Sequence, residues 1–354
     1  MGKAQKDRQP ARKKKKKSAA VDRKSQPKTK RGSASRTRSA DGLSPTEKEV
    51  LLNLEEILKQ RIVGKDEAIK RIANIIRIRR THLDFRPDRP DGAFLIVGPA
   101  GVGKTEFALA VAEVLLSGEE QMILLDMADY TEEADLDDLL VTLFPGDTDT
   151  LIEGSLTSPV RENPRAVLLL RGLEHAHPSV QRLLLHILDR GTLTDAQGAV
   201  SFNQTVIFAT TRLHPDESET VSQIGFNRQS LSRDERCRKM LEDQFTPELV
   251  AAFNEVLYFH KLSAADVRQI ARYKVNRVLE RLRAQKRGVV VSEKVYDAFI
   301  TDDEVRSAGA RYLNRALEEK LFTPLSKYLL THGEAHSIAV DVRGNRVVIH
   351  QPGE

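Results

Sequence analysis

The 354-residue sequence has a single cysteine and no long apolar run, and each shortage excludes a class of protein. The single cysteine, Cys237, cannot close an internal disulfide, and without a cysteine cluster the nine scattered histidines do not suggest structural zinc. The longest apolar run is Phe107–Ala112, too short to span a bilayer, and the Lys- and Arg-rich start lacks the apolar stretch of a secretory signal. We therefore expect a cytoplasmic protein with no transmembrane segment.

The charges are divided between two segments of opposite sign. Residues 1–42 contain sixteen Lys and Arg against three Asp, a charge of +13, and no aromatic residue, whereas the rest has 40 basic and 48 acidic residues. A segment with this much charge cannot bury enough apolar surface to offset the entropy that its chain would lose on folding. We therefore expect residues 1–42 to be a disordered basic tail. Its run Arg12–Lys17 would attract a polyanion such as nucleic acid without reading a base sequence; a solubilising extension is the alternative.

The pattern of residues 43–354 predicts an α/β architecture followed by a smaller, mainly helical part. Ser44 and Glu47 have the spacing of a helix capping box. Helical stretches then alternate with continuous apolar strands, which indicates a parallel sheet covered by helices on both faces. After about residue 262 two long amphipathic helices and a few strands follow. The expected strands of the first part are Phe94–Val97, Met122–Leu125, Ala166–Leu170 and Thr205–Ala209; those of the second are Val289–Val291, Ser337–Val342 and Arg346–His350, with helices Ala264–Ala284 and Ala310–Leu330.

The clearest motif is a phosphate-binding loop between an expected strand and an expected helix. It has the form G-x-x-x-x-G-K-[ST], in which glycines let backbone N–H groups surround a polyphosphate and the helix N-terminus adds partial positive charge. We expect its lysine to reach the β- and γ-phosphates of ATP, and its threonine hydroxyl to face Mg²⁺ if that ion is bound. The loop consists of Gly98, Pro99, Ala100, Gly101, Val102, Gly103, Lys104 and Thr105.

From about Leu54 to its end the chain resembles the second ATPase module of Clp-type AAA+ unfoldases, and the ClpA/ClpC branch in particular. The stretch Ile62-Val-Gly-Lys-Asp-Glu-Ala68 is similar to the family's adenine-side motif, and Gly309-Ala-Arg311 to its sensor-2 motif. The resemblance implies an AAA+ P-loop large domain over residues 43–262 and a small Clp-type lid domain over residues 263–354. It also implies that Ile62, Val63 and Arg311 contact ATP at the junction of the two domains, and that subunits assemble into a ring.

Four parts of the family's machinery are replaced in this sequence. The third strand, which ends in Asp-Glu in the family, runs into Arg171-Gly172, and the sensor after the fourth strand reads Thr210-Thr211-Arg212. The arginine-finger position reads Ala251-Ala252, and the axial pore loop carries Asp147-Thr148-Asp149 in place of an aromatic residue. Losing a finger alone costs about 10³–10⁵ in rate in phosphoryl-transfer enzymes. We therefore expect weak or absent ATP hydrolysis and assign no catalytic residue.

Two of the replacements and one insertion suggest further roles. Arg171 and Arg212 could contact the γ-phosphate and partly replace Mg²⁺ as counter-charge, since guanidinium groups match phosphate oxygens. The alternative is that both simply pair with nearby acids in a decayed site. Glu174, two residues beyond Gly172, is expected to be an ordinary helix-start acid and not a substitute base. Ile224, Gly225 and Phe226 resemble the tripeptide with which ClpA- and ClpC-like relatives dock on the ClpP peptidase, which implies a peptidase-like partner or an inherited remnant.

Three hypotheses for the function follow. The first is an ATP-binding, hydrolysis-deficient Clp-like subunit with a regulatory or structural role in protein quality control or a related assembly. The second is an active ATP-dependent chaperone or unfoldase subunit of a Clp-type protease. The third is a scaffold that binds polyanions through residues 1–42.

Overall fold

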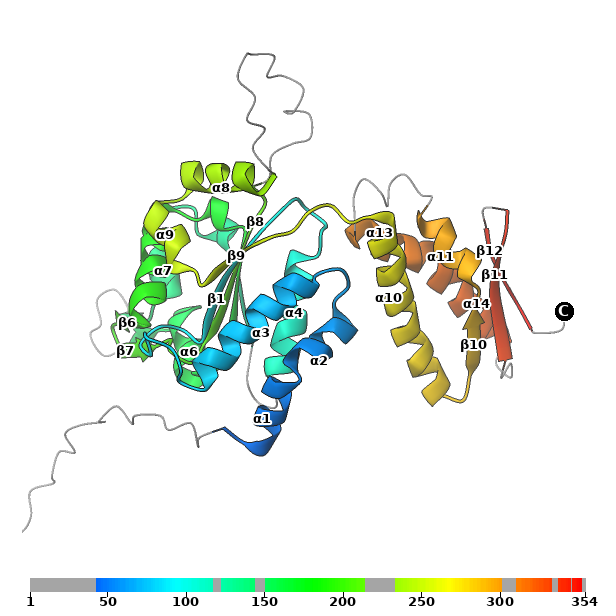
Figure 1. The fold of residues 1–354 in the computed structure, drawn as a ribbon, viewed down its shortest axis with the longest axis horizontal. Coiled ribbons are helices and arrows are strands. Elements are labelled where there is room, and N and C mark those ends of the chain that lie inside the picture. The colour runs from blue at the N-terminus through cyan, green and yellow to red at the C-terminus, as the bar shows by residue number, and fades with distance from the viewer. Residues whose placement is uncertain are drawn as a thin grey trace, which may run out of the picture. The chain divides into compact units, whose positions relative to one another are not determined.

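In a computed structural model of the chain, the structure describes residues 43–116, 122–143, 150–213, 233–300, 310–332, 337–344 and 346–351, all within one compact unit (Figure 1). The elements of the first part are α1 (Pro45–Leu52), α2 (Leu54–Arg61), α3 (Asp66–Arg80), β1 (Gly92–Val97), α4 (Lys104–Leu115), β2 (Met122–Asp126), η2 (Met127–Asp129), α5 (Leu136–Leu139), β3 (Thr142–Leu143), β4 (Leu151–Ile152), α6 (Thr157–Glu162), β5 (Val167–Arg171), η3 (Leu173–His175), α7 (Pro178–Arg190), β6 (Thr192–Asp195), β7 (Gly198–Ser201), β8 (Val206–Thr211), α8 (Arg233–Gln244), α9 (Pro247–Ala252) and β9 (Glu255–Tyr258).

The first part is built on a five-stranded parallel sheet with the order β2-β5-β8-β1-β9. Successive residues of β1 alternate between two apolar cores, since Leu95 belongs to the core with α7 and α9 while Phe94 belongs to the core with α2, α3 and α4. Every residue of β1 is buried. The predicted α/β class and the parallel sheet covered on both faces are thereby confirmed.

The capping box predicted at Ser44 and Glu47 is confirmed by the geometry of α1. The Ser44 side chain accepts a hydrogen bond from the Glu47 backbone N–H, and the Glu47 carboxylate accepts one from the Ser44 N–H at 2.8 Å. This reciprocal pair satisfies N–H groups that the first helical turn leaves without partners.

The C-terminal part has its own apolar core, formed by helices and a three-stranded sheet with the order β10-β11-β12. The strands β10 and β11 pair in parallel, and β11 and β12 pair antiparallel. The predicted boundary between residues 262 and 263 stays a prediction. The elements are α10 (Ala264–Ala284), β10 (Gly288–Val291), α11 (Glu293–Ile300), α13 (Ala310–Leu317), η5 (Glu318–Phe322), α14 (Thr323–Thr331), β11 (Ser337–Arg343) and β12 (Arg346–His350).

One predicted helix differs from the structure in its middle. The stretch Ala310–Leu330 is helical, but the segment η5 within it is a π-helix that separates α13 from α14. Pro324 follows this segment and has no N–H to donate to the carbonyl of residue 320, which favours a widened turn just before it.

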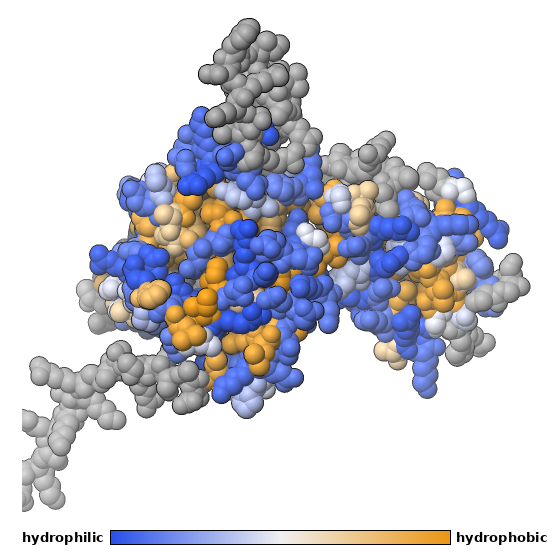
Figure 2. Space-filling model, in the orientation of Figure 1, coloured by the Kyte–Doolittle hydropathy of each residue, from blue (hydrophilic) through white to orange (hydrophobic). Residues whose placement is uncertain are grey.

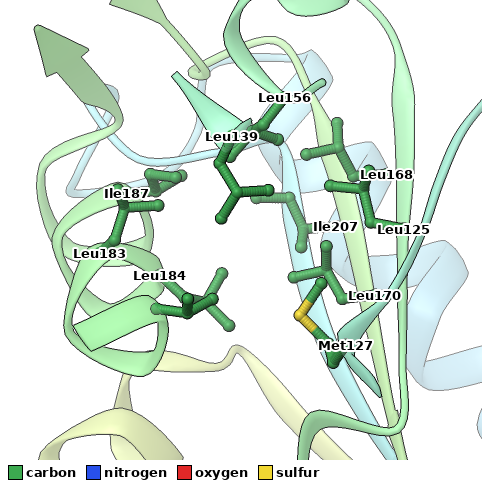
Figure 3. A pocket seen from close by; sticks show the side chains of 11 residues that line it. Leu125, Met127, Leu139, Leu156, Leu168, Leu170, Leu183, Leu184, Ile187 and Ile207 are labelled. Carbon is green, nitrogen blue, oxygen red and sulfur yellow. The ribbon is translucent and has the colours of Figure 1, made fainter. Parts of the chain in front are cut away.

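A small apolar cavity lies inside the first part, between the sheet and α7 (Figure 3). Its volume is about 20 Å³ and its lining is apolar, with leucines from β5 and α7 facing each other across it. A space of this size could admit one water, but a water needs polar partners that this lining does not offer, so the cavity is a packing defect and not a binding site.

On the outside, Figure 2 shows a largely hydrophilic face in which apolar residues are exposed as separate patches.

Candidate functional site

The predicted phosphate loop leaves the carboxyl end of β1, at the edge of the sheet where ligands bind in open α/β folds. Gly98 is required by a close approach, because a Cβ there would lie 2.2 Å from the Phe259 carbonyl oxygen. Gly103 is the N-cap residue of α4 and has φ +94, in the left-handed region. A Cβ added at Gly103 would have no neighbouring atom within 4 Å. The loop is therefore shaped by glycine on its inner side and is open where a phosphate would approach.

Lys104 is the first residue of α4, and Thr105 follows it. The Lys104 Nζ donates hydrogen bonds to the carbonyl oxygens of Gly98 at 2.6 Å and Pro99 at 2.7 Å. The ammonium group is thus held inside the curl of the loop by two carbonyl oxygens. An anion entering the loop would meet this charge together with the backbone N–H groups at the start of α4.

The segment predicted to face the adenine lies beside the same loop. Ile62 and Val63 line the same cleft, and a Cβ on Gly64 would lie 2.5 Å from the Asp266 carboxylate of α10. The next residue, Lys65, lies over the Phe259 ring with its Nζ 4.6 Å from the ring centroid. Burial lowers the pKa of Lys65 below its usual value, while the charge of Asp266 opposes that shift.

The predicted sensor-2 segment reaches the phosphate loop through its backbone. The Ala310 N–H, at the start of α13, donates a hydrogen bond of 2.9 Å to the Gly101 carbonyl oxygen. Arg311 is the next residue of α13, and its side chain lies outside the described residues. The assignment of Arg311 to ATP stays a prediction.

Arg171, the last residue of β5, forms an ion pair with an acid, and its partner, Asp126, was not identified from the sequence. Its Nη2 lies 3.1 Å from the Asp126 Oδ2, and the two residues are register partners at the ends of β5 and β2. Gly172 follows with φ +69, in the left-handed region, and its N–H donates to the Thr210 hydroxyl at 3.3 Å. The end of β5 therefore presents a guanidinium and a glycine turn to the cleft.

Arg212 follows β8 and behaves differently from Arg171. Its backbone N–H donates to the Glu174 Oε1 at 3.0 Å, whereas its exposed side chain has no ion pair with any described carboxylate. The Glu174 side chain is only 11% exposed, and its other oxygen is buried without a hydrogen-bond partner. Glu174 thus holds the end of β8 in place. The alternative in which both arginines pair with nearby acids agrees with the structure at Arg171 alone.

These groups line one cleft of about 1330 Å³. That volume exceeds the 300–1,000 Å³ or so of a typical small-molecule pocket, so a nucleotide fits with room to spare. Among its lining residues are Arg61, Ile62, Val63, Lys65, Ala100, Gly101, Val102, Gly103, Lys104, Thr105, Glu113, Asp126, Arg171, Gly172, His175, Thr210, Arg212, Ile270, Tyr273 and Asn314.

The donor groups of the cleft suit a nucleotide better than a metal ion. The open glycine loop, the Lys104 ammonium and the start of α4 fit a polyphosphate. For Mg²⁺ the cleft offers the Thr105 hydroxyl and the Asp126 carboxylate, but that carboxylate is paired with Arg171, the last residue of β5, and Arg212 follows β8 where a hard cation prefers carboxylates. The described residues contain no group of three or more His, Cys, Asp or Glu side chains placed to hold a metal ion. Mg²⁺ therefore fits only as an ion carried largely by the nucleotide's own phosphates.

Several predicted features cannot be placed. The pore-loop residues Asp147, Thr148 and Asp149, the tripeptide Ile224, Gly225 and Phe226, and the tail 1–42 lie outside the described residues. The position predicted for the arginine finger is described: Ala251 and Ala252 end α9, the first exposed and the second buried.

Sequence reasoning missed Asp126 and the hydrogen bond between Glu174 and the Arg212 N–H. The partnership of Asp126 with Arg171 depends on the register between β2 and β5. One signal was available, since both residues end parallel strands, and such strands end at one edge of a sheet.

Comparison with known proteins decides the family. Residues 89–256 match the family model described as "AAA domain (Cdc48 subfamily)", and residues 262–341 match "C-terminal, D2-small domain, of ClpB protein". The ATP-dependent Clp protease ATP-binding subunit ClpC of Staphylococcus aureus is 33% identical over 318 residues, which are 88% of this chain. The chain carries a Clp-type AAA+ module.

Two further similarities place the Clp-type module among its relatives. The negative regulator of genetic competence ClpC/MecB of Bacillus subtilis is 34% identical over 316 residues. A closed-state reconstruction of Hsp104 with ATPγS and FITC casein matches with a TM-score of 0.74 at 28% identity, over 88% of this chain and 53% of that one. The chain spans only 38% and 39% of the lengths of the two curated relatives.

The Clp-type family supports nucleotide binding at the cleft, and the AAA+ fold predicted from the resemblance is confirmed. In the described part of the chain, no helix is long and apolar enough to cross a membrane.

Proposed function

We propose that this Clp-type module binds ATP in the cleft around Lys104 and does not split it at a useful rate. It acts as a regulatory or structural subunit, alone or with active relatives, in protein quality control or a related assembly. The observation that carries the proposal is the contrast within one cleft. The glycine loop and Lys104 at the start of α4 support phosphate binding, whereas β5 ends in Arg171 and Arg212 follows β8, where the Clp resemblance expects Asp-Glu and a polar sensor.

The chemistry that remains is binding and orientation. When ATP is bound, its phosphates supply the negative charge that the cleft's cations attract. Lys104 and the first turn of α4 would hold the β- and γ-phosphates, Ile62 and Val63 would contact the base, and Arg311 would reach the phosphates from α13. Arg171 and Arg212 would add positive charge, which reduces the dependence on Mg²⁺. We assign no general base: one Glu174 oxygen, Oε1, accepts the Arg212 N–H, and the other, Oε2, is buried.

Binding without turnover suffices for a structural role. A nucleotide that contacts both the phosphate loop and α13 favours the arrangement of the two segments in which both contacts are made, and so shifts the population of states. Assembly would then depend on ATP but not on its cleavage, and a ring of subunits is the assembly we propose. Sedimentation with and without a non-hydrolysable ATP analogue tests this; identical profiles would count against it.

The direct test of the proposed function is a titration of the full chain with ATP, with Mg²⁺ and with EDTA, beside Lys104→Ala. We expect Lys104-dependent binding in both conditions. Loss of a charge-assisted hydrogen bond costs about 1.5–3 kcal/mol, or about 10- to 150-fold in affinity. Binding that vanishes with EDTA would overturn the metal-tolerant part of the proposal, and binding unaffected by Lys104→Ala would overturn the site.

A second candidate is an active ATP-dependent chaperone or unfoldase subunit that works with a ClpP-like peptidase. Its relative in Staphylococcus aureus, an ATP-binding subunit of a Clp protease, favours this function. It requires that another subunit supply the groups replaced at Arg171, Gly172 and Ala251. Lys104-dependent phosphate release that appears only on mixing with an active relative would support it.

A third proposal is a scaffold that binds polyanions through residues 1–42. If it holds, deleting those residues should abolish salt-sensitive nucleic-acid binding.

A further inference from the structure

Arg171 is engaged in the structure by a carboxylate that cannot itself reach the phosphate loop. Adjacent strands of a sheet lie about 4.7–4.9 Å apart, and the order β2-β5-β8-β1 places β5 two strands and β2 three strands from the loop-bearing strand. The Arg171 backbone is thus about 10 Å from β1 and the Asp126 backbone about 14 Å. A long arginine can span the shorter gap, whereas a short aspartate cannot span the longer one. Asp126 therefore affects the loop only through Arg171 and through its charge at a distance.

Asp126 is also fixed in place. Its Oδ1 accepts a hydrogen bond from the Ala128 N–H at 3.3 Å, which caps the short helix η2, while its Oδ2 pairs with Arg171. Strand pairing with β5 fixes its backbone. Arg171 has a long side chain that is 40% exposed and lines the cleft with Lys104. If the guanidinium turns towards a phosphate, it must leave Asp126 behind.

We propose that Asp126 sets how strongly this module prefers ATP to ADP, because it competes with the γ-phosphate for Arg171. The inference rests on the proposed function and deepens it. ADP has no γ-phosphate to draw Arg171 away, so the ion pair with Asp126 persists when ADP binds. When ATP binds, Arg171 exchanges its ion pair with Asp126 for one with the γ-phosphate. The strength of the pair with Asp126 therefore sets how much binding free energy the exchange adds.

The exchange gives a non-hydrolysing site a use as a sensor. A site that holds ATP without splitting it equilibrates with the solution, so its occupancy by ATP follows the ratio of ATP to ADP. The ratio of the dissociation constants for ATP and ADP sets the ATP-to-ADP ratio in solution at which half of the occupied sites hold ATP. Asp126 and Arg171 are the two residues that set this ratio of dissociation constants.

The expected effect is modest because the pair is partly exposed. Its side chains are 40% and 35% exposed, and exposed ion pairs measured by double-mutant cycles correspond to about 1.4- to fivefold in an equilibrium constant. Asp126→Asn keeps an oxygen that can accept the Ala128 N–H and removes the charge. It should therefore tighten ATP binding about 1.4- to fivefold and leave ADP binding unchanged.

The experiment is titration calorimetry of the full chain with ATP and with ADP, in EDTA, for wild type, Asp126→Asn, Arg171→Ala and the double variant. Asp129→Asn is the matched control, since Asp129 is an exposed acid three residues along on η2 and loses the same charge. We expect Asp126→Asn to raise the ATP-to-ADP preference and Asp129→Asn to leave it unchanged. Arg171→Ala should lower that preference and abolish the effect of Asp126→Asn in the double variant.

Two results would overturn the inference. In one, Asp126→Asn leaves the ATP-to-ADP preference unchanged in a protein that melts like wild type. In the other, Asp126→Asn changes the ATP-to-ADP preference equally in the wild-type and in the Arg171→Ala background, which would mean that the Asp126 charge acts on the nucleotide at a distance. If Asp126→Asn does not fold, an Arg171→Ala protein whose ATP-to-ADP preference equals that of wild type overturns the inference by itself. Lys104-independent binding, by contrast, would refute the proposed function first.

Discussion

Reinstalling both carboxylates at the end of β5 should destabilise the protein and should not restore ATP turnover. The variant is Arg171→Asp with Gly172→Glu, which writes Asp-Glu into the position where the Clp resemblance expects it. Two features of the structure oppose it. Gly172 has φ +69 and ψ 50, a left-handed conformation, and residue 171 faces Asp126 across the sheet.

The cost can be worked out from these two features. A non-glycine residue in the left-handed region costs about 1–2 kcal/mol. Replacing Arg171 by Asp removes a partly exposed ion pair, about 0.2–1 kcal/mol, and sets two carboxylates against each other at a similar cost. The free energy of unfolding should therefore fall by about 1.5–4 kcal/mol, or about 3–16 °C in Tm for a domain of this size. An added Cβ would lie 3.0 Å from the His175 Cδ2, but that ring is half-exposed and can move aside.

The assay is thermal unfolding beside phosphate release. Gly344→Glu is the matched control for backbone strain, because Gly344 has φ +67 and would have no atom within 4 Å of an added Cβ. It should lose a similar amount of stability from strain alone. Phosphate release by the double variant should stay at the Lys104→Ala background, since Arg212 and Ala251 remain. Full stability of Gly172→Glu, or sustained turnover by the double variant, would refute the reasoning.

Three further predictions concern stability. Leu168→Ala, beside the internal cavity, should cost about 2–5 kcal/mol of unfolding free energy in chemical denaturation, because it enlarges a void already present; a smaller loss would mean that the site collapses. Glu174→Ala should cost about 0.5–1.5 kcal/mol because the exposed Arg212 N–H exchanges its acceptor for water, whereas Glu174→Gln should melt close to wild type; equal losses would contradict this role. The hydrogen bond from Arg89 holds the pKa of Asp189 below its usual value, so its stabilisation is complete above the unfolded pKa of about 3.9 and is lost as the pH falls through the folded value. The Tm difference between wild type and Asp189→Asn should therefore close in acid, and a gap constant with pH would contradict the assignment.

Much of the fold was predictable because its signals are local. The strands Phe94–Val97 and Thr205–Ala209 were expected as apolar runs between helices, and both lie in the central sheet as β1 and β8. The helix α10 was predicted with its observed bounds, since Ser263 caps it and its apolar residues recur at helical spacing. The π-helix η5 was not predicted, because a shift of hydrogen bonds by one residue leaves the apolar pattern almost unchanged.

The candidate site was predictable in part. The phosphate loop was identified from its own residues, because eight consecutive positions carry its geometry. The Arg171–Asp126 pair was missed because it joins residues 45 positions apart through a strand register that composition does not reveal. The same holds for a second contact of Glu174, which lies in the first turn of η3 as expected and also accepts the N–H of Arg212, 38 positions away. What the sequence could not supply in each case was the pairing between strands.

The most direct test of the central claim follows the fate of the bound nucleotide. The full chain is loaded with ATP and Mg²⁺, freed of excess nucleotide, incubated for an hour, quenched in acid and analysed for ATP and ADP. We predict that the protein-bound nucleotide is still ATP, and that Lys104→Ala retains none. Bound nucleotide that has become ADP in wild type would contradict the account.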